Sequence, residues 1–413
     1  MSWTKCSLSP ARIEPFAVLL VMLGILFVTT PAQPAKGANK FLGNVSTSGS
    51  VRSDFITYWN HITPETECQW ASIESTRNQM NWTGADRIAS YAKENGIQWT
   101  FHALLTGGAY PGWMGSISQE DMREEVEEWF NAVAVRYPNV QMIIVINDAY
   151  DLSTRSAPWK NPLGGDGSTG YDWIIKTFKM ARERWPKAIL VLNDYNNIES
   201  DNVVSWTVGL IDTLKKYNTP IDAIGCQAHE AYKLATSKVK ANIDKLAAAG
   251  LPIYISEYDI DQPVDSIQRK IMEEQFTMFW NHPKIIGITY YGYIHGKTWR
   301  AYTGLMSQDG IERPSLTWLK NFVQNNSNPP NDFSITNVIS PFRIVRRCDL
   351  NCNTPVVKHA GVRFFDLQGR LSAYHPISGS ESSSLNSVNQ NVLFTLYGGT
   401  GFISKPVKSL KNK

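Results

Sequence analysis

The feature that most constrains this chain is an alternation of short apolar runs with longer amphipathic segments between residues 40 and 325. Each run has the length and the β-branched or aromatic content typical of a buried strand. The eight runs are KFLGNVS, ITPETECQW, IQWTFHALL, VQMIIVIND, AILVLND, IDAIGCQAH, LPIYISEYD and IIGITYYGY. Eight strands that alternate with helices predict parallel pairing and a closed (β/α)8 TIM barrel.

Two of the intervening segments show how the helices begin and end. Residues 118–137 start at Ser118 with Asp121 three residues later, which is a capping-box-like pattern. Residues 237–250 end on Gly250, directly before the run LPIYISEYD, so the local order is helix, turn and strand. An open, doubly wound sheet is the alternative fold. No glycine-rich phosphate-binding loop follows the first strand, which weighs against that alternative.

The N-terminal residues 1–38 differ in composition from the alternating region. Lys5 and Arg12 precede the apolar run FAVLLVMLGILFV, and small residues and prolines follow it, which is a signal-peptide pattern. The run is shorter than the roughly 20 residues of a spanning helix, and an uncleaved anchor is the alternative. We therefore expect a secreted or cell-surface protein, with the barrel at residues 39–325.

Composition argues against several classes of function. The formal net charge of +3 is close to neutral, so nothing global indicates a nucleic-acid partner. The 14 Trp and 17 Tyr residues favour stacking on flat apolar ligands such as sugar rings. His102 and His229 fall on different strands without a Cys or carboxylate at ligand spacing, so we expect no metal site and no cofactor.

The cysteines do not form a disulfide framework. Cys68 and Cys226 lie in strand-like surroundings and are expected to be packed free thiols. Cys348 and Cys352 are close enough in sequence to bridge a small loop in an exported chain.

Polar side chains follow several of the predicted strands. They are Glu65, His102, Asn147, Asp148, Asn193, Asp194, Gln227, His229 and Glu257. The carboxyl ends of barrel strands meet at one mouth, where the active sites of this fold lie. Glu257 ends an apolar run, with Asp259 at same-face spacing, and makes the best nucleophile candidate. The alternative is a structural carboxylate that caps a helix or pairs with a lysine.

The order and spacing of the motifs resemble glycoside hydrolase family 10, the endo-β-1,4-xylanases, from about Lys40 to Phe322. The matching motifs are KFLGNV, ITPE, LNDYNN, AIGCQAH, YISEYDID, GITYYGY, TGLMSQDG and RPSLTWL. The resemblance implies that xylan or xylo-oligosaccharide is the ligand and that Glu257 is the nucleophile. It also implies a supporting network of Gln227, His229 and Asp259.

The same resemblance places the general acid/base at Asp148, after Asn147, where the family has Glu. The implied chemistry is retaining hydrolysis, in which two carboxyls stand roughly 5 to 5.5 Å apart. The shorter Asp pulls its oxygens back by about 1.5 Å. A displacement of about 1 Å at a catalytic group costs on the order of a hundredfold in rate.

Further departures fall on the substrate-binding side. The chain has Thr66 and Gln69 for Asn and Lys, Thr106 for Trp, Ile143-Ile144 for Trp-Asp and Tyr291 for Trp, whereas Glu65, His102 and Trp299 are kept. Under the resemblance, each lost group hydrogen-bonded or stacked on the sugars beside the scissile bond. The sequence predicts an exported, retaining endo-β-1,4-xylanase, either active with a pocket that tolerates these substitutions or impaired in turnover. The alternative is a degenerate xylan-binding protein on the same barrel, and an unrelated sugar-binding barrel is a third reading.

The C-terminal region changes character after an Asn and Pro linker at residues 326–332. Residues 333–413 are rich in basic residues and contain the β-type runs FRIVRRC, GVRFFDLQGR and NVLFTLYGG, so we expect a small β module. This module resembles the sorting or basic terminal domains of exported polysaccharide-degrading enzymes, which implies a contact with the cell surface or secretion machinery. A small β appendage is the alternative.

Overall fold

The computed structural model describes residues 33–46 and 49–327 and three later strand segments. Eight parallel strands pair in chain order, and β8 pairs with β1 to close the barrel. The strands are β1 (Phe41–Ser46), β2 (His61–Pro64), β3 (Gln98–Thr106), β4 (Met142–Asn147), β5 (Ile189–Asp194), β6 (Ala223–Cys226), β7 (Ile253–Tyr258) and β8 (Ile285–Tyr290). The predicted (β/α)8 barrel is therefore confirmed.

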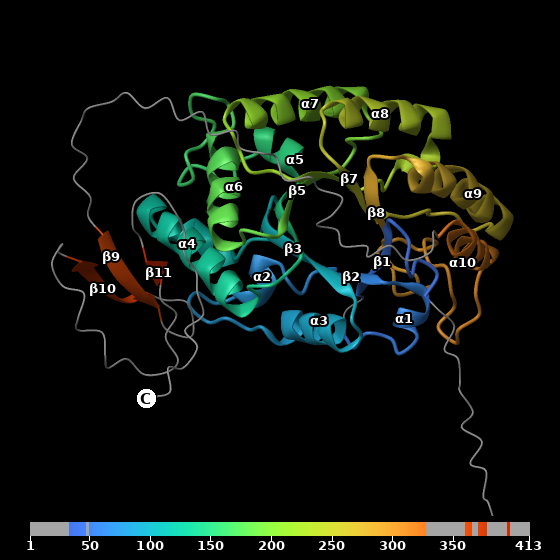
Figure 1. The fold of residues 1–413 in the computed structure, drawn as a ribbon, viewed down its shortest axis with the longest axis horizontal. Helices are drawn as coiled ribbons and strands as arrows, with labels where there is room; N and C mark the ends of the chain where they lie inside the picture. The colour runs from blue at the N-terminus through green and yellow to red at the C-terminus, as the bar shows by residue number, and fades with distance from the viewer. Residues whose placement is uncertain (1–32, 47–48, 328–359, 366–370, 378–394, 397–413) are drawn as a thin grey trace, which may run out of the picture. The chain divides into compact units, whose positions relative to one another are not determined.

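Helices surround the barrel strands (Figure 1). They are α1 (Phe55–Tyr58), α2 (Trp70–Ile73), α3 (Thr83–Glu94), α4 (Gln119–Arg136), α5 (Ala149–Thr154), α6 (Asp172–Arg184), α7 (Asp201–Lys216), α8 (Thr236–Ala248), α9 (Asp265–Asn281) and α10 (Pro314–Asn326), with short 3-10 helices at Gly112–Ser116 and Ala231–Lys233. The short helix α5 follows β4 directly, so it lies at the mouth that carries the predicted site.

The barrel strands are almost entirely buried, because helices cover their outer face and side chains fill the interior. One cluster of buried side chains consists of Phe41, Ala103, Met142, Ile144, Ile189, Val191, Ala223, Tyr254 and Ile286. Seven of the eight barrel strands, all except β2, contribute to this cluster, which is typical of a packed barrel interior. Because side chains fill the barrel interior, the space for a site lies at the mouth where the carboxyl ends of the strands meet.

The helix signals in the sequence are borne out locally. The Ser118 hydroxyl accepts a hydrogen bond from the backbone N–H of Asp121 at 3.1 Å and caps α4. Helix α8 ends at Ala248, and Gly250 follows with a φ of 86°, a left-handed conformation that glycine adopts without steric cost. The chain can therefore turn sharply from α8 into β7.

The second predicted strand is shorter than expected. Strand β2 ends at Pro64, and a turn leads from there to α2, because the polar residues after Pro64 do not continue an apolar run. Cys68 lies in this turn, so its expected strand-like setting is wrong. Cys68 and Cys226 are nevertheless buried free thiols, as predicted.

Three described strands follow the barrel in sequence, namely β9 (Ala360–Phe365), β10 (Leu371–Ile377) and β11 (Thr395–Leu396). They form an antiparallel sheet in the order β10, β9, β11. Strands β9 and β11 fall in predicted β-type runs, whereas β10 was not predicted. The apolar run of the signal-peptide pattern, the run FRIVRRC, Cys348 and Cys352 lie outside the described residues. The last six residues of the predicted leader, 33–38, are described, and Ala35 and Ala38 are buried in the core.

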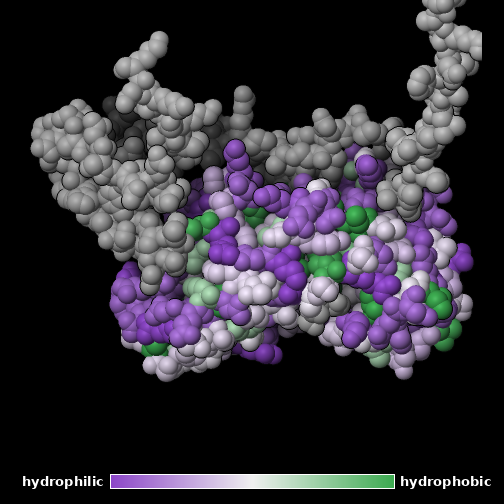
Figure 2. Space-filling model, turned by 90° about the horizontal axis from the view of Figure 1, so that it is seen from below, coloured by the Kyte–Doolittle hydropathy of each residue, from purple (hydrophilic) through white to green (hydrophobic). Residues whose placement is uncertain are grey.

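The surface of the described residues is mixed in character. Figure 2 shows hydrophilic side chains over most of one face, with hydrophobic ones in small separate groups where atoms are coloured. Within the described part of the chain, no helix is long and apolar enough to span a bilayer.

Candidate active site

A cavity of about 440 Å³ opens among the residues that follow the barrel strands. Its lining consists of Glu65, Thr66, Gln69, His102, Asn147, Asp148, Tyr195, Gln227, His229, Glu257, Tyr291 and Trp299. Ten of the eleven residues predicted for the site are therefore in the lining. The other one, Asp259, is fully buried just beyond β7 and contacts two lining residues. Polar strand ends thus converge at one mouth, as the alternation predicted.

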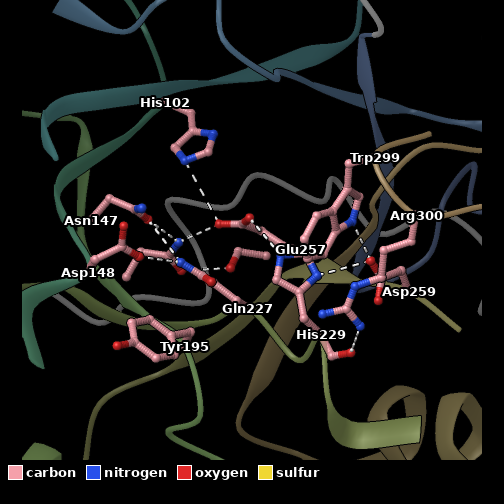
Figure 3. Close-up of polar contacts among 12 residues, drawn as sticks. His102, Asn147, Asp148, Tyr195, Gln227, His229, Glu257, Asp259, Trp299 and Arg300 are labelled. Atoms are coloured by element: carbon pink, nitrogen blue, oxygen red, sulfur yellow. Dashed lines mark hydrogen bonds and ion pairs between the residues drawn. The ribbon is translucent and has the colours of Figure 1, made fainter. Parts of the chain in front are cut away.

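Glu257 is the most heavily supported carboxylate in the cavity. It is the fifth residue of β7 and is nearly buried. Its Oε1 accepts a hydrogen bond from Nδ2 of Asn193 at 2.7 Å, and Nε2 of His102 lies 3.8 Å from the same oxygen. Its Oε2 lies 3.2 Å from Nε2 of His229 (Figure 3). Both oxygens are therefore oriented by neighbours from other strands.

His229 connects Glu257 to Asp259. Nδ1 of His229 lies 3.0 Å from Oδ2 of Asp259, and the same oxygen accepts a hydrogen bond from the indole N–H of Trp299 at 2.7 Å. Burial alone would lower the pKa of His229, but the hydrogen bonds with Asp259 and Glu257 raise it to about 9. His229 is consequently an imidazolium between two carboxylates at neutral pH.

Asp148 faces the cavity from the end of β4. Its backbone adopts a left-handed conformation, with a φ of 63° and a ψ of 44°, which Asp tolerates better than most residues. Its Oδ1 accepts a hydrogen bond from Nε2 of Gln227 at 2.8 Å. The same Gln227 nitrogen also lies 3.4 Å from Oδ1 of Asn147, so one amide serves both residues of the Asn-Asp pair.

A chain of hydrogen bonds joins Asp148 to Glu257. Oδ1 of Asn147 accepts from Nδ2 of Asn193 at 2.7 Å, and this nitrogen also donates to Glu257. Oδ1 of Asn193 in turn accepts from the hydroxyl of Ser256 at 2.6 Å. A Cβ atom on Gly225 would stand 2.2 Å from this Asn193 oxygen, so only glycine leaves room for the linking amide.

The two carboxyls have opposite electrostatics. Burial and the nearby charge of Glu257 raise the pKa of Asp148 to about 6, although the Gln227 hydrogen bond opposes the shift. Burial would also raise the pKa of Glu257, but the hydrogen bond from His229, the charges of His102 and His229, and the Asn193 amide lower it overall. Asp148 therefore takes up a proton at higher pH than Glu257 does, so below about pH 6 one carboxyl is protonated while the other is ionised.

No Lys or Arg side chain is among the residues that line the cavity. Burial and the charges of Glu67 and Glu257 raise the pKa of Glu65 to about 7. Gln69 lies at the position where the resembling family has Lys, so no ammonium counters this acidic character. Among the described residues, no group of three or more His, Cys, Asp or Glu side chains is arranged to hold a metal ion.

Two of the expected departures do not affect the cavity lining. Ile143 and Ile144 are buried in the core, four and three residues before the end of β4, and Ile144 belongs to the cluster in the barrel interior. Neither side chain is among the residues that line the cavity. Thr106 is also outside the lining, and its hydroxyl accepts a hydrogen bond from the backbone N–H of Ala109 at 2.9 Å.

Three contributors were not assigned from the sequence. Asn193 was noted only as a strand end, although its amide links the two carboxyls. Tyr195 lines the cavity one residue after β5. Arg300 approaches the network from the loop after β8 (Figure 3). The motif LNDYNN holds the first two, so the signal was present for them, whereas nothing in sequence spacing placed Arg300.

Comparison with known proteins gives a consistent match. Residues 34–322 match the description "Glycosyl hydrolase family 10". The chain is 42% identical over 287 residues to "Endo-1,4-beta-xylanase B" of Cellvibrio japonicus (strain Ueda107), covering 69% of this chain and 46% of that protein. It is 28% identical to "Endo-1,4-beta-xylanase A" of Caldicellulosiruptor saccharolyticus, covering 61% of this chain and 80% of that protein. This chain thus spans about half the length of the Cellvibrio relative.

Solved structures agree in fold. Native xylanase 10B from Thermotoga maritima superposes with a TM-score of 0.64 at 24% identity, covering 71% of this chain and 98% of that chain. Because the family description spans most of the chain and a relative exceeds 40% identity, the assignment rests on sequence as well as fold. The chain belongs to glycosyl hydrolase family 10.

Proposed function

We propose that this protein hydrolyses internal β-1,4-xylosidic bonds of xylan with retention of configuration. The observation that carries the proposal is the pairing of Asp148 and Glu257 across one cavity, with a pKa raised to about 6 for the first and a lowered pKa for the second. Glycosidases of this class need one protonated and one ionised carboxyl at the scissile bond.

Glu257 is the nucleophile in this proposal. One of its oxygens forms a bond to the anomeric carbon while the bond from that carbon to the glycosidic oxygen breaks. Asp148 donates its proton to the departing oxygen. In the second step the Asp148 carboxylate takes a proton from water as this water attacks the anomeric carbon and releases Glu257. Asn193 and His229 orient the Glu257 oxygens throughout.

The relatives support xylan as the substrate class. The Cellvibrio and Caldicellulosiruptor relatives are named endo-1,4-beta-xylanases. A structural neighbour, xylanase 10B from Thermotoga petrophila RKU-1, is described in complex with xylobiose. Tyr195, Tyr291 and Trp299 in the cavity lining provide aromatic surfaces suited to sugar rings.

The test is release of reducing sugar from xylan by the full chain, beside Glu257→Ala. We expect release by the parent and none by the variant, while the variant still binds xylan in an affinity gel. A matched control is Glu273→Ala, because Glu273 lies on α9, outside the cavity lining, and pairs with Arg269 near the surface. Equal rates for the parent and Glu257→Ala would overturn the nucleophile assignment.

One observation favours a second candidate, a xylan-binding protein with little turnover. Asp148 is one methylene shorter than the Glu of the resembling family, and with a pKa of about 6 it is mostly ionised at neutral pH. A short, ionised acid is a poor proton donor. Xylan binding without release of reducing sugar, at pH 5 as well as pH 7, would favour this candidate.

Export is the remaining part of the proposal. It rests on the pattern in residues 1–38, where basic residues precede an apolar run and small residues follow. N-terminal sequencing of protein from the culture medium tests it. We expect a start within residues 30–40, whereas an intact N-terminus in a membrane fraction would indicate an uncleaved anchor. The contact of the C-terminal β module with a cell surface or secretion machinery is proposed from sequence resemblance alone.

A further inference from the structure

Arg300 joins two loops beside the candidate site without lining the cavity itself. Its Nη1 donates a hydrogen bond to the backbone oxygen of His229 at 2.9 Å, and its Nη2 donates to Oε1 of Glu230 at 2.6 Å. His229 and Glu230 follow β6, whereas Arg300 belongs to the loop between β8 and α10. One planar guanidinium therefore ties the second loop to the segment that carries His229.

The same guanidinium lies over the face of Trp299, with its Cζ atom 4.2 Å from the ring centroid. Trp299 is half exposed, with a relative accessibility of 50%, yet its indole N–H reaches the fully buried Asp259 at 2.7 Å. Its ring centroid lies 4.6 Å from that of His229. An exposed side chain on a loop needs a constraint to keep such a contact, because its rotamer freedom opposes it.

Arg300 supplies that constraint through a series of contacts. Its two hydrogen bonds fix the guanidinium, the fixed guanidinium holds the Trp299 ring by a cation–π contact, and the ring delivers its N–H to Asp259. Its positive charge also acts on Asp259: burial raises the pKa of that carboxyl, and Arg300 is among the groups that oppose the rise. Figure 3 shows Arg300, Trp299, Asp259 and His229 adjacent on one side of Glu257.

We propose that Arg300 is a positioning residue for hydrolysis, which holds Trp299 over the cavity and thereby keeps the Asp259, His229 and Glu257 network aligned. This inference rests on the proposed function, since it assigns a role in that reaction. Arg300 is not among the residues that line the cavity. Its effect on turnover passes through Trp299.

The experiment compares Arg300→Met with Arg313→Met in the full chain. Arg313 is a matched control, because it also bridges the loop after β8 to a neighbouring loop, by donating to the backbone oxygens of Tyr302, Gly304 and Gln262. Both side chains are mostly buried, at 19% and 14% exposure. We expect similar losses of stability in urea unfolding. Only Arg300→Met should lower kcat/KM on xylan, by roughly tenfold to a hundredfold, because a misplacement of about 1 Å has effects of that order.

A double-mutant cycle with Trp299→Phe identifies the route of the effect. Phe keeps a ring but lacks the N–H that reaches Asp259. If Arg300 acts through Trp299, adding Arg300→Met to Trp299→Phe lowers kcat/KM by less than threefold further. Full additivity of the two losses would overturn the proposed route.

A spectroscopic readout keeps the test independent of turnover. The indole N–H signal of Trp299 in a ¹⁵N NMR spectrum is identified by its absence in Trp299→Phe. We expect it to shift or broaden in Arg300→Met and to stay unchanged in Arg313→Met. If Arg300→Met fails to fold, Arg300→Lys replaces it, which keeps the charge but loses the two-pronged contact.

The outcomes separate this inference from the proposed function. Absence of xylan hydrolysis in the parent chain would overturn the proposed function, and the NMR comparison would still test whether Arg300 fixes Trp299. An unchanged Trp299 signal in Arg300→Met, or equal kcat/KM in the two methionine variants, would overturn the inference.

Discussion

His229 lies between Glu257 and Asp259, with its Nε2 atom 3.2 Å from Oε2 of Glu257. The three groups come from two adjacent strand ends, β6 and β7, which pair in the barrel. Both carboxylates favour the charged form of the ring, and its pKa rises to about 9 despite burial. This arrangement has consequences for stability as well as for chemistry.

The first consequence is a dependence of stability on pH. The pKa of His229 is about 9 when folded and about 6.5 when unfolded, so its contribution is fully present below about pH 6.5 and is lost as pH rises through about 9. We expect the unfolding free energy of the parent to fall between pH 6 and pH 9.5 by about 3 kcal/mol more than that of His229→Gln. Urea unfolding at the two pH values measures the difference, and parallel losses in both proteins would contradict the assignment.

The second prediction concerns the pH dependence of turnover. Asp148 must be protonated to act as the acid, and its pKa is about 6, so kcat/KM on xylan should fall as pH rises through about 6. Glu257 must be ionised, so kcat/KM should also fall at low pH, where this carboxylate becomes protonated. Because the pKa of Glu257 is lowered, that decline should lie below the ordinary Glu value of about 4.3. An aryl xyloside with a good leaving group needs little protonation. The rate of glycosyl-enzyme formation from it should therefore not decline as pH rises through about 6. The same decline in rate above about pH 6 with both substrates would argue against Asp148 as the acid.

The third prediction concerns the length of the acid. Asp148→Glu adds one methylene and should raise kcat on xylan by about tenfold or more, if the acid is the limiting group. Its left-handed backbone suits Glu less than Asp, so we also expect a loss of stability of about 1 kcal/mol. If the single change is silent, adding Gln69→Lys should be needed, because groups that position one sugar act together. Initial rates and thermal unfolding of the parent and the two variants distinguish these cases.

Much of the fold and part of the site could be predicted from the sequence. Strand ends in a parallel barrel share one mouth, so polar residues that end apolar runs converge whatever the loops do. This rule placed Glu257 and His229 correctly beside one another. It could not show on which side a residue inside a run would point, and Ile143 and Ile144 proved to be core residues.

The rest of the site depends on contacts across loops. Arg300 meets His229 and Trp299 because the loop after β8 folds back over the mouth, and no periodicity encodes that path. The role of Asn193 likewise depends on the close approach of β5 to β6 at Gly225, which is visible only in three dimensions. The left-handed conformation of Asp148 is a third feature of this kind.

The fourth prediction concerns the independence of the barrel. Helix α10 ends at Asn326, after β8 has closed the sheet onto β1. We therefore expect a chain truncated at residue 328 to remain soluble and to unfold in one cooperative transition. Its kcat/KM on xylan should stay within about threefold of the full chain, in line with the usual tolerance of changes far from a site. A molten or insoluble product would show that the C-terminal residues complete the fold.

The central claim is that Glu257 forms a covalent bond to the sugar during retaining hydrolysis, and a trapping experiment tests it most directly. A 2-fluoro xylobioside with a good leaving group slows the second step, so a glycosyl-enzyme should accumulate. Mass spectrometry of the intact protein and of its peptides should then find one added xylobiosyl group, attached to Glu257. Attachment to another residue, or xylan cleavage with inverted anomeric configuration and no trapped ester, would contradict the account.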